Sequence, residues 1–61
     1  MFWLKKIRKE LGLTQVQAAQ KIGISRFWYI DIELGRKNPS IKTAKKIAKT
    51  LGFDWKQFYE E

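Results

Sequence analysis

The segment TQVQAAQKIGISRFWYIDIEL, residues 14–34, is divided by the tripeptide Gly23-Ile24-Ser25. A glycine that tolerates positive φ, an apolar residue and then a hydroxyl-bearing residue are typical of a chain that ends one helix and begins the next within three residues. Apolar residues recur at intervals of three and four on both sides of this turn, which predicts helices over residues 15–22 and 26–34. A turn this short fixes the angle between the two helices.

The same three-residue pattern occurs twice more, at Gly12-Leu13-Thr14 and at Gly52-Phe53-Asp54. Each polar cap is followed three residues later by a glutamine, Gln17 or Gln57. Such a glutamine side chain can bond back to the backbone of the cap, so the sequence predicts a capping box at both helix starts.

Apolar spacing extends the helical pattern over the rest of the chain. The five predicted helices cover residues 2–11, 15–22, 26–34, 41–51 and 55–60. The inner faces of the first and fourth predicted helices are formed by Leu4, Ile7, Leu11, Ile41, Ala44, Ile47, Ala48 and Leu51. Nothing alternates with the period of a strand. The sequence therefore predicts one compact all-α domain over residues 1–61, in which the second and third helices form a helix-turn-helix unit.

The composition of these 61 residues argues against several classes of protein. There is no cysteine and no histidine, which removes disulfides, thiolate chemistry, the commonest zinc ligands and the commonest general base. We therefore expect no enzymatic activity, no cofactor, no metal site and no small-molecule ligand. No apolar run approaches the roughly 18 residues of a membrane span, so no membrane segment is expected.

The charge is large and unevenly distributed. The chain has a formal net charge of +7. Residues 1–53 hold twelve of the 13 basic side chains but only three of the six acidic ones. A polyanion is expected to bind this body of the chain and not residues 54–61. A lysine-rich surface that serves only for solubility explains the same composition equally well.

Motifs along the chain closely resemble the Cro/cI-type helix-turn-helix family of phage and bacterial repressors. They are residues 7–15 (IRKELGLTQ), Ala19, residues 23–26 (GISR), Ile32-Glu33, residues 35–40 (GRKNPS) and residues 47–52 (IAKTLG). The resemblance implies a lambda-repressor-like fold and sequence-specific binding of double-stranded DNA. It also implies a transcriptional repressor that acts as a dimer on a pseudo-palindromic operator, in the cytoplasm of a bacterial or phage-infected cell.

The resemblance assigns roles to individual residues. Arg26 matches a base-reading position, and its planar fork suits guanine O6 and N7. Arg8 and Glu33 match an ion pair that ties the first helix to the third. The residues that match phosphate-contacting positions are Thr14, Gln15, Arg36, Lys37 and Asn38.

The outer face of the third helix departs from the family pattern. Steps of 100° leave Phe27, Ile30, Asp31 and Leu34 on this face, and three of these four are apolar where polar readers are usual. Phe27 and Ile30 can pack on thymine methyls, and Asp31 can accept a hydrogen bond from a cytosine amino group. The alternative is a protein-interaction module that uses the apolar outer face of this helix.

The last predicted helix carries more aromatic area than docking requires. Trp55, Phe58 and Tyr59 share one stripe. Phe58 is expected in the core through its contact with Phe53, which leaves Trp55 and Tyr59 as a candidate surface for a weak homodimer. The alternative is that all three aromatic residues close the small core.

Overall fold

The computed structural model describes residues 1–60 as a set of short helices around one core. The elements are α1 (Phe2–Glu10), α2 (Gln15–Ile22), α3 (Arg26–Glu33), α4 (Ile41–Leu51) and the 3-10 helix η1 (Trp55–Tyr59). No strand occurs in this part of the chain, so the all-α class is confirmed. The predicted domain boundary, residue 61, lies just outside the described residues. Within residues 1–60, no helix has both the length and the apolar character needed to cross a membrane.

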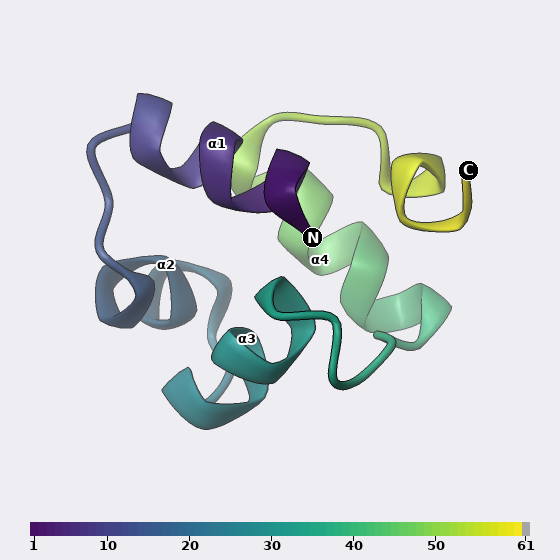
Figure 1. Cartoon of the computed structure of the whole chain (residues 1–61), viewed down its shortest axis with the longest axis horizontal. Coiled ribbons are helices and arrows are strands. Elements are labelled where there is room, and N and C mark those ends of the chain that lie inside the picture. Colours follow the sequence, from purple (N-terminus) through teal and green to yellow (C-terminus); the bar gives the residue numbers. More distant parts are fainter. Residues whose placement is uncertain (61) are drawn as a thin grey trace.

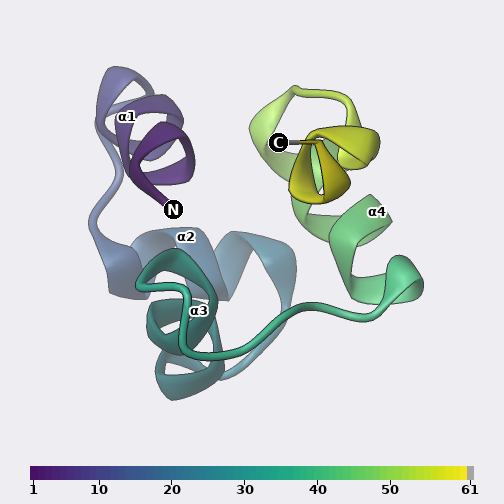
Figure 2. The ribbon, with the colours of Figure 1, turned by 45° about the vertical axis from the view of Figure 1, so that its right-hand side comes forward.

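The helices are arranged so that α2 and α3 form one compact unit and α4 lies beside it, to the right in Figure 1. α2 packs against both α3 and α4, while η1 packs against α4. α1 contacts α3 across the top of the unit, and the segment between α3 and α4 runs along the outside of the molecule (Figure 2). This arrangement leaves one long side of α3 without a covering element.

Local capping explains where α2 and α3 begin and end. The Thr14 hydroxyl accepts a hydrogen bond from the Gln17 backbone N–H at 3.1 Å, and the Gln17 side chain accepts one from the Thr14 N–H at 2.9 Å. The predicted capping box at this position is therefore present. Gly23 ends α2 with a left-handed φ of 87°, and the Ser25 hydroxyl caps α3 by accepting from the Trp28 N–H. The turn is built as the sequence predicts.

The prediction of a fifth α-helix is wrong, because residues 55–59 form a 3-10 helix. The Gln57 N–H donates to the Asp54 carbonyl at 3.0 Å, the i to i+3 bond that defines this tighter helix. The Asp54 carboxylate accepts from the Lys56 N–H instead, so the second predicted capping box does not form.

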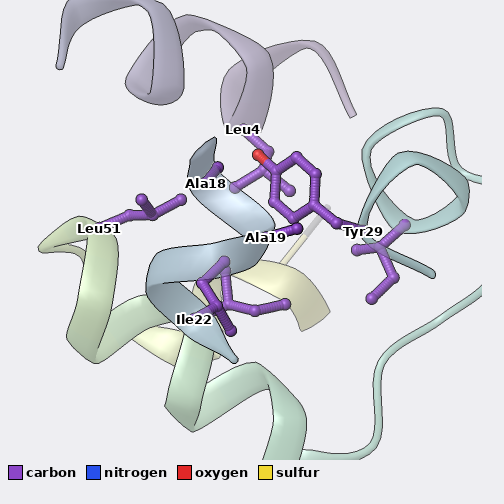
Figure 3. Close-up of a cluster of buried hydrophobic side chains, with 8 residues drawn as sticks. Leu4, Ala18, Ala19, Ile22, Tyr29 and Leu51 are labelled. Carbon is purple, nitrogen blue, oxygen red and sulfur yellow. The ribbon is translucent and has the colours of Figure 1, made fainter. Parts of the chain in front are cut away.

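The core lies between α2 and its neighbours. Figure 3 shows Tyr29 and Leu4 approaching Ala18 and Ala19 from one side of α2 and Leu51 approaching from the other. These side chains and those of Ile22, Ile32 and Ile47 are almost fully buried. The small residues at positions 18 and 19 allow α2 to lie close to its neighbours.

Two residues predicted for the inner faces are instead exposed. Leu11 is 51% exposed and Ile41 is 55% exposed. In α1 the buried stripe is formed by Leu4 and Arg8, because the Arg8 side chain is drawn inward by a buried carboxylate, and Leu11 follows the last helical residue. Ile41 is the first residue of α4, and the buried face of that helix begins one half-turn later at Thr43.

Aromatic rings connect the two ends of the chain. Trp3 meets Phe53 and Phe58 edge-to-face, with ring centroids 5.2 and 5.1 Å apart, and Phe53 lies 5.6 Å from Phe58. These contacts hold η1 beside α1. In the same 3-10 helix, Trp55 is half-buried and Tyr59 is exposed.

Candidate nucleic-acid interface

A buried ion pair fixes α1 to the end of α3. Arg8 Nε donates to Glu33 Oε1 at 2.7 Å, and Arg8 Nη2 lies 3.4 Å from Oε2. Arg8 Nη1 donates to the Leu13 carbonyl at 2.8 Å, which also ties down the segment that leads into α2. The resemblance implied a structural ion pair between Arg8 and Glu33, and the structure places the two side chains in bidentate contact.

The same carboxylate receives two further hydrogen bonds. Gln15 Nε2 donates to Glu33 Oε2 at 2.7 Å, and the Tyr29 hydroxyl donates to Oε1 at 3.2 Å. Burial alone raises the pKa of Glu33, but the hydrogen bonds from Arg8 and Gln15 outweigh it and hold the pKa below its ordinary value. Burial, together with the charge of Glu33, raises the pKa of Tyr29. The first residue of α2 is thus tied directly to the last residue of α3.

The start of α2 presents polar groups at the surface. Thr14 is exposed, and its hydroxyl is engaged by the capping box. Gln15 is half-buried, and its amide nitrogen carries a second N–H beyond the one given to Glu33. The unbonded backbone N–H groups of the first turn add partial positive charge here.

The segment after α3 folds back onto that helix. The backbone N–H groups of Arg36 and Lys37 donate to the Asp31 carbonyl at 2.8 and 3.3 Å. Their side chains lie 3.7 and 3.8 Å from the Asp31 carboxylate and are largely exposed. Asn38 is exposed as well. This places three of the predicted phosphate contacts together at the C-terminal end of α3.

The uncovered side of α3 combines one cation with apolar side chains. Phe27 is 66% exposed and Leu34 is 54% exposed, while Ile30 and Asp31 are half-buried. The Arg26 guanidinium lies 4.8 Å from the centroid of the Phe27 ring, a cation–π contact that holds both groups at the start of the helix.

The predicted dimer residues, Trp55 and Tyr59, lie next to each other on η1. The rings of Trp55 and Tyr59 meet edge-to-face at 6.0 Å, and Lys45 Nζ lies 5.1 Å above the Trp55 ring. The Tyr59 hydroxyl donates to the Pro39 carbonyl at 3.0 Å, and half of the Tyr59 surface is exposed. Phe58 packs inward, as expected.

This arrangement offers binding chemistry: amide donors and two cations near the C-terminal end of α3, the cation of Arg26 at its start, and a partly apolar helix face between them. Among residues 1–60, no group of three or more acidic, histidine or cysteine side chains is placed to hold a metal ion. The family model described as helix-turn-helix matches residues 4–58. The chain belongs to the helix-turn-helix family.

The relatives of this helix-turn-helix chain include phage and bacterial regulators, which confirms the family predicted from the sequence. It is 48% identical over 59 residues to the uncharacterized HTH-type transcriptional regulator YqaF of Bacillus subtilis (strain 168), covering 97% of this chain and 78% of the relative. It is 51% identical over 49 residues to the immunity repressor protein of Bacillus phage phi105, covering 80% of this chain and 34% of that protein.

An archaeal relative has a similar length. An uncharacterized HTH-type transcriptional regulator of Methanothermobacter thermautotrophicus is 45% identical over 49 residues, which cover 80% of this chain and 71% of the relative. The helix-turn-helix chain thus spans most of the two uncharacterized regulators and about a third of the phage repressor. No solved structure matches it significantly. Neither the family description nor these names indicates an enzymatic activity.

Two features of the helix-turn-helix site were not predicted from the sequence. The bond between Gln15 and Glu33 joins residues 18 positions apart, and no local pattern reports such a contact. Trp28 lines a groove beside α4 together with Lys42 and Lys46. The four-residue spacing of these two lysines places them on one side of α4, and that spacing is the signal that could have revealed them.

Proposed function

We propose that this chain is a lambda-repressor-like, single-domain regulator of transcription that binds double-stranded DNA in a sequence-specific manner, as a repressor in a bacterial or phage-infected cytoplasm. One observation carries the proposal: the buried Glu33 carboxylate locks α2 to α3, while the cations and the reading face of α3 stay exposed. Membership of the helix-turn-helix family and the similarity to transcriptional regulators and a phage immunity repressor support it.

Two groups of residues are proposed to contact the phosphates. At the start of α2, backbone amides capped by Thr14 and the second amide N–H of Gln15 are suited to a backbone phosphate. After the C-terminal end of α3, Arg36, Lys37 and Asn38 are proposed to contact phosphate and sugar. The bonds from Arg36 and Lys37 to Asp31 are long and exposed, so releasing the cations to a phosphate costs little.

Base readout is proposed for the exposed side of α3. Arg26, at the start of the helix, is proposed to bind guanine O6 and N7. Phe27 and Ile30 are proposed to contact base edges next to it. Asp31 is proposed to accept from a cytosine amino group, a bond that competes with its contacts to Arg36 and Lys37.

Salt dependence separates the two kinds of contact. Log affinity for duplex DNA is expected to fall against log salt with a slope of roughly −0.9 per phosphate contacted. Lys37→Ala is expected to weaken binding to all sequences alike and to reduce the slope by about 1. Arg26→Ala is expected to lose about 1–3 kcal/mol on the preferred site and to relax its preference. Fluorescence anisotropy with a selected duplex and a random duplex measures both effects.

One outcome would contradict the assignment of Arg26 as a base reader. If Arg26→Ala and Lys37→Ala lower affinity equally on selected and random DNA, Arg26 is not a base reader. Lys56→Ala is the matched control for charge, because Lys56 is an exposed lysine on η1, away from α3. Lys56→Ala is expected to leave the sequence preference unchanged and to reduce the salt slope by less than Lys37→Ala does.

A second copy of the chain is the proposed partner on DNA. Trp55 and Tyr59 are proposed as the contact between copies, because their rings pack against each other, half of the Tyr59 surface is exposed and Trp55 is only half-buried. The homodimer is proposed to be weak.

A further inference from the structure

Resting on the DNA-binding function proposed above, we propose that α3 reads thymine methyl groups. The contact is made by an apolar reading surface formed by Phe27, Ile30 and Leu34. The preferred half-site therefore combines a G·C pair, bound by Arg26, with A·T pairs beside it whose thymine methyls meet this surface.

The apolar reading surface is a continuous stripe on the uncovered side of α3. Its members are separated by three and four residues, which places them on one helix face. Phe27 and Leu34 are more than half exposed and Ile30 is half-buried. From the first member to the last, the stripe rises about 10 Å along the helix axis. That length corresponds to about three base-pair steps of 3.4 Å.

The major groove offers only one apolar group to such a surface. Guanine, cytosine and adenine present hydrogen-bonding atoms there, whereas thymine adds a C5-methyl beside its O4. Phe27, Ile30 and Leu34 have no side-chain donor or acceptor, so they cannot satisfy the polar edges. Burying one methyl-sized group changes affinity by about fourfold. A few such contacts are enough to favour thymine at definite positions.

The charge around the surface favours DNA over a protein as the occupant. Arg26 lies at one end of the stripe, and Arg36 and Lys37 lie at the other. The acidic residue on this face, Asp31, lies 3.7 and 3.8 Å from those two cations. An apolar stripe with cations at both ends, on a chain of net charge +7, is complementary to a groove whose floor holds methyl groups and whose edges are phosphates.

The contact between Arg26 and Phe27 sets the order of the bases read. The guanidinium lies 4.8 Å from the ring centroid, so both groups approach the DNA at the same level of the helix. If the guanidinium binds guanine O6 and N7, the ring is brought over the adjacent base pair. A thymine at that pair would place its methyl against the ring.

Removing single methyl groups from the DNA tests the inference directly. A preferred duplex is first selected from random sequences, and each thymine is then replaced in turn by deoxyuridine, which lacks only the C5-methyl. The native chain is expected to lose about fourfold in affinity at each contacted thymine. Phe27→Ala is expected to bind the parent duplex more weakly and to become insensitive to deoxyuridine at one position. Ile30→Ala is expected to do the same at a neighbouring position.

A control variant, together with the possible outcomes, distinguishes failure of this inference from failure of the proposed function. Leu11→Ala removes an apolar side chain that is 51% exposed at the end of α1, and it is expected to keep the full deoxyuridine response. The inference is overturned if deoxyuridine duplexes bind as tightly as the parent, or if selection yields sites without thymine, while Lys37→Ala still weakens all binding. If the chain binds no duplex in a salt-dependent manner but captures a protein through Phe27, both the inference and the proposed function fail.

Discussion

Within residues 1–60, Glu33 has the most side-chain hydrogen-bond partners, since its carboxylate binds Arg8, Gln15 and Tyr29. Each partner comes from a different helix or helix position, so the carboxylate sets the relative orientation of α1, α2 and α3. A buried carboxylate without its cation is strongly destabilising, and so is a buried arginine without its carboxylate. The position of the uncovered side of α3 therefore depends on Glu33, a residue that is not expected to contact DNA.

This arrangement predicts a specific loss of stability in acid. The pKa of Glu33 is lowered in the folded chain, so the carboxylate contributes stability that is present above its unfolded pKa of about 4.3 and is lost as pH falls through the folded value. The free energy of unfolding, measured with urea from pH 6 down to pH 2, is expected to decrease over the acidic part of this range. Glu33→Gln is expected to be less stable at pH 7 and to show a flatter profile. Equal profiles for the two proteins would contradict the role assigned to Glu33.

Individual residues show where sequence reasoning reaches its limit. Gly23 and Thr14 were predicted correctly because their roles depend on residues no more than three or four positions away. Leu11 and Ile41 were assigned to the core on spacing alone, and both are exposed. In α1 the inner position was taken by Arg8, and periodicity does not anticipate an arginine whose burial is offset by a carboxylate 25 residues away.

Among the elements, the α2–α3 turn matters most because it sets how α3 is presented to a partner. Gly23 has a φ of 87°, a conformation that costs a side chain with a Cβ about 1–2 kcal/mol. A Cβ at this position would also lie 3.4 Å from Lys46 Nζ, at the far end of a flexible side chain. Backbone strain is therefore the larger of the two costs.

Gly23→Val is expected to destabilise the chain by at least this 1–2 kcal/mol. For a domain of this size that is roughly 4–16 °C in melting temperature, measurable by circular dichroism. Gln20→Val is the matched control, since it introduces the same β-branched side chain at an exposed position of α2. The control is expected to cost less than about 0.7 kcal/mol. An unchanged melting temperature for Gly23→Val would show that positive φ at the turn is not required.

The last element was the least predictable. Phe53, Asp54 and Gln57 resemble the pattern at the start of α2, yet residues 55–59 adopt a 3-10 helix. With only five residues after the cap, few i to i−4 bonds can form, and packing against Trp3 decides the conformation. The sequence predicted the position of this element correctly, but not its type.

At the scale of the whole molecule, charge and aromatic area lie in different places. The cations proposed for phosphate contact lie at the C-terminal end of α3, whereas the pair of Trp55 and Tyr59 lies on η1, which packs against α4. The resemblance to repressors predicted the DNA-contacting surface and the aromatic stripe predicted the other, but the sequence could not show how they are connected. The bond from Tyr59 to the Pro39 carbonyl ties the aromatic pair to the segment that leads from the phosphate-contacting residues into α4.

One recognition helix reads only a few base pairs, so useful specificity requires two copies of the chain on a pseudo-palindrome with half-sites about 34 Å apart. The proposed contact between copies consists of Trp55 and Tyr59. A surface of this size is small for a stable dimer, so we expect a mainly monomeric chain in solution and two copies on a symmetric duplex. Sedimentation of the free chain and of its complex measures both states.

Trp55→Ala and Tyr59→Ala are expected to reduce binding of the second copy to the symmetric duplex, while a single half-site is still bound. Phe2→Ala, which truncates an exposed aromatic side chain on α1, is expected to leave two copies bound. If one copy binds each symmetric site and neither substitution on η1 changes this, the contact between copies does not exist.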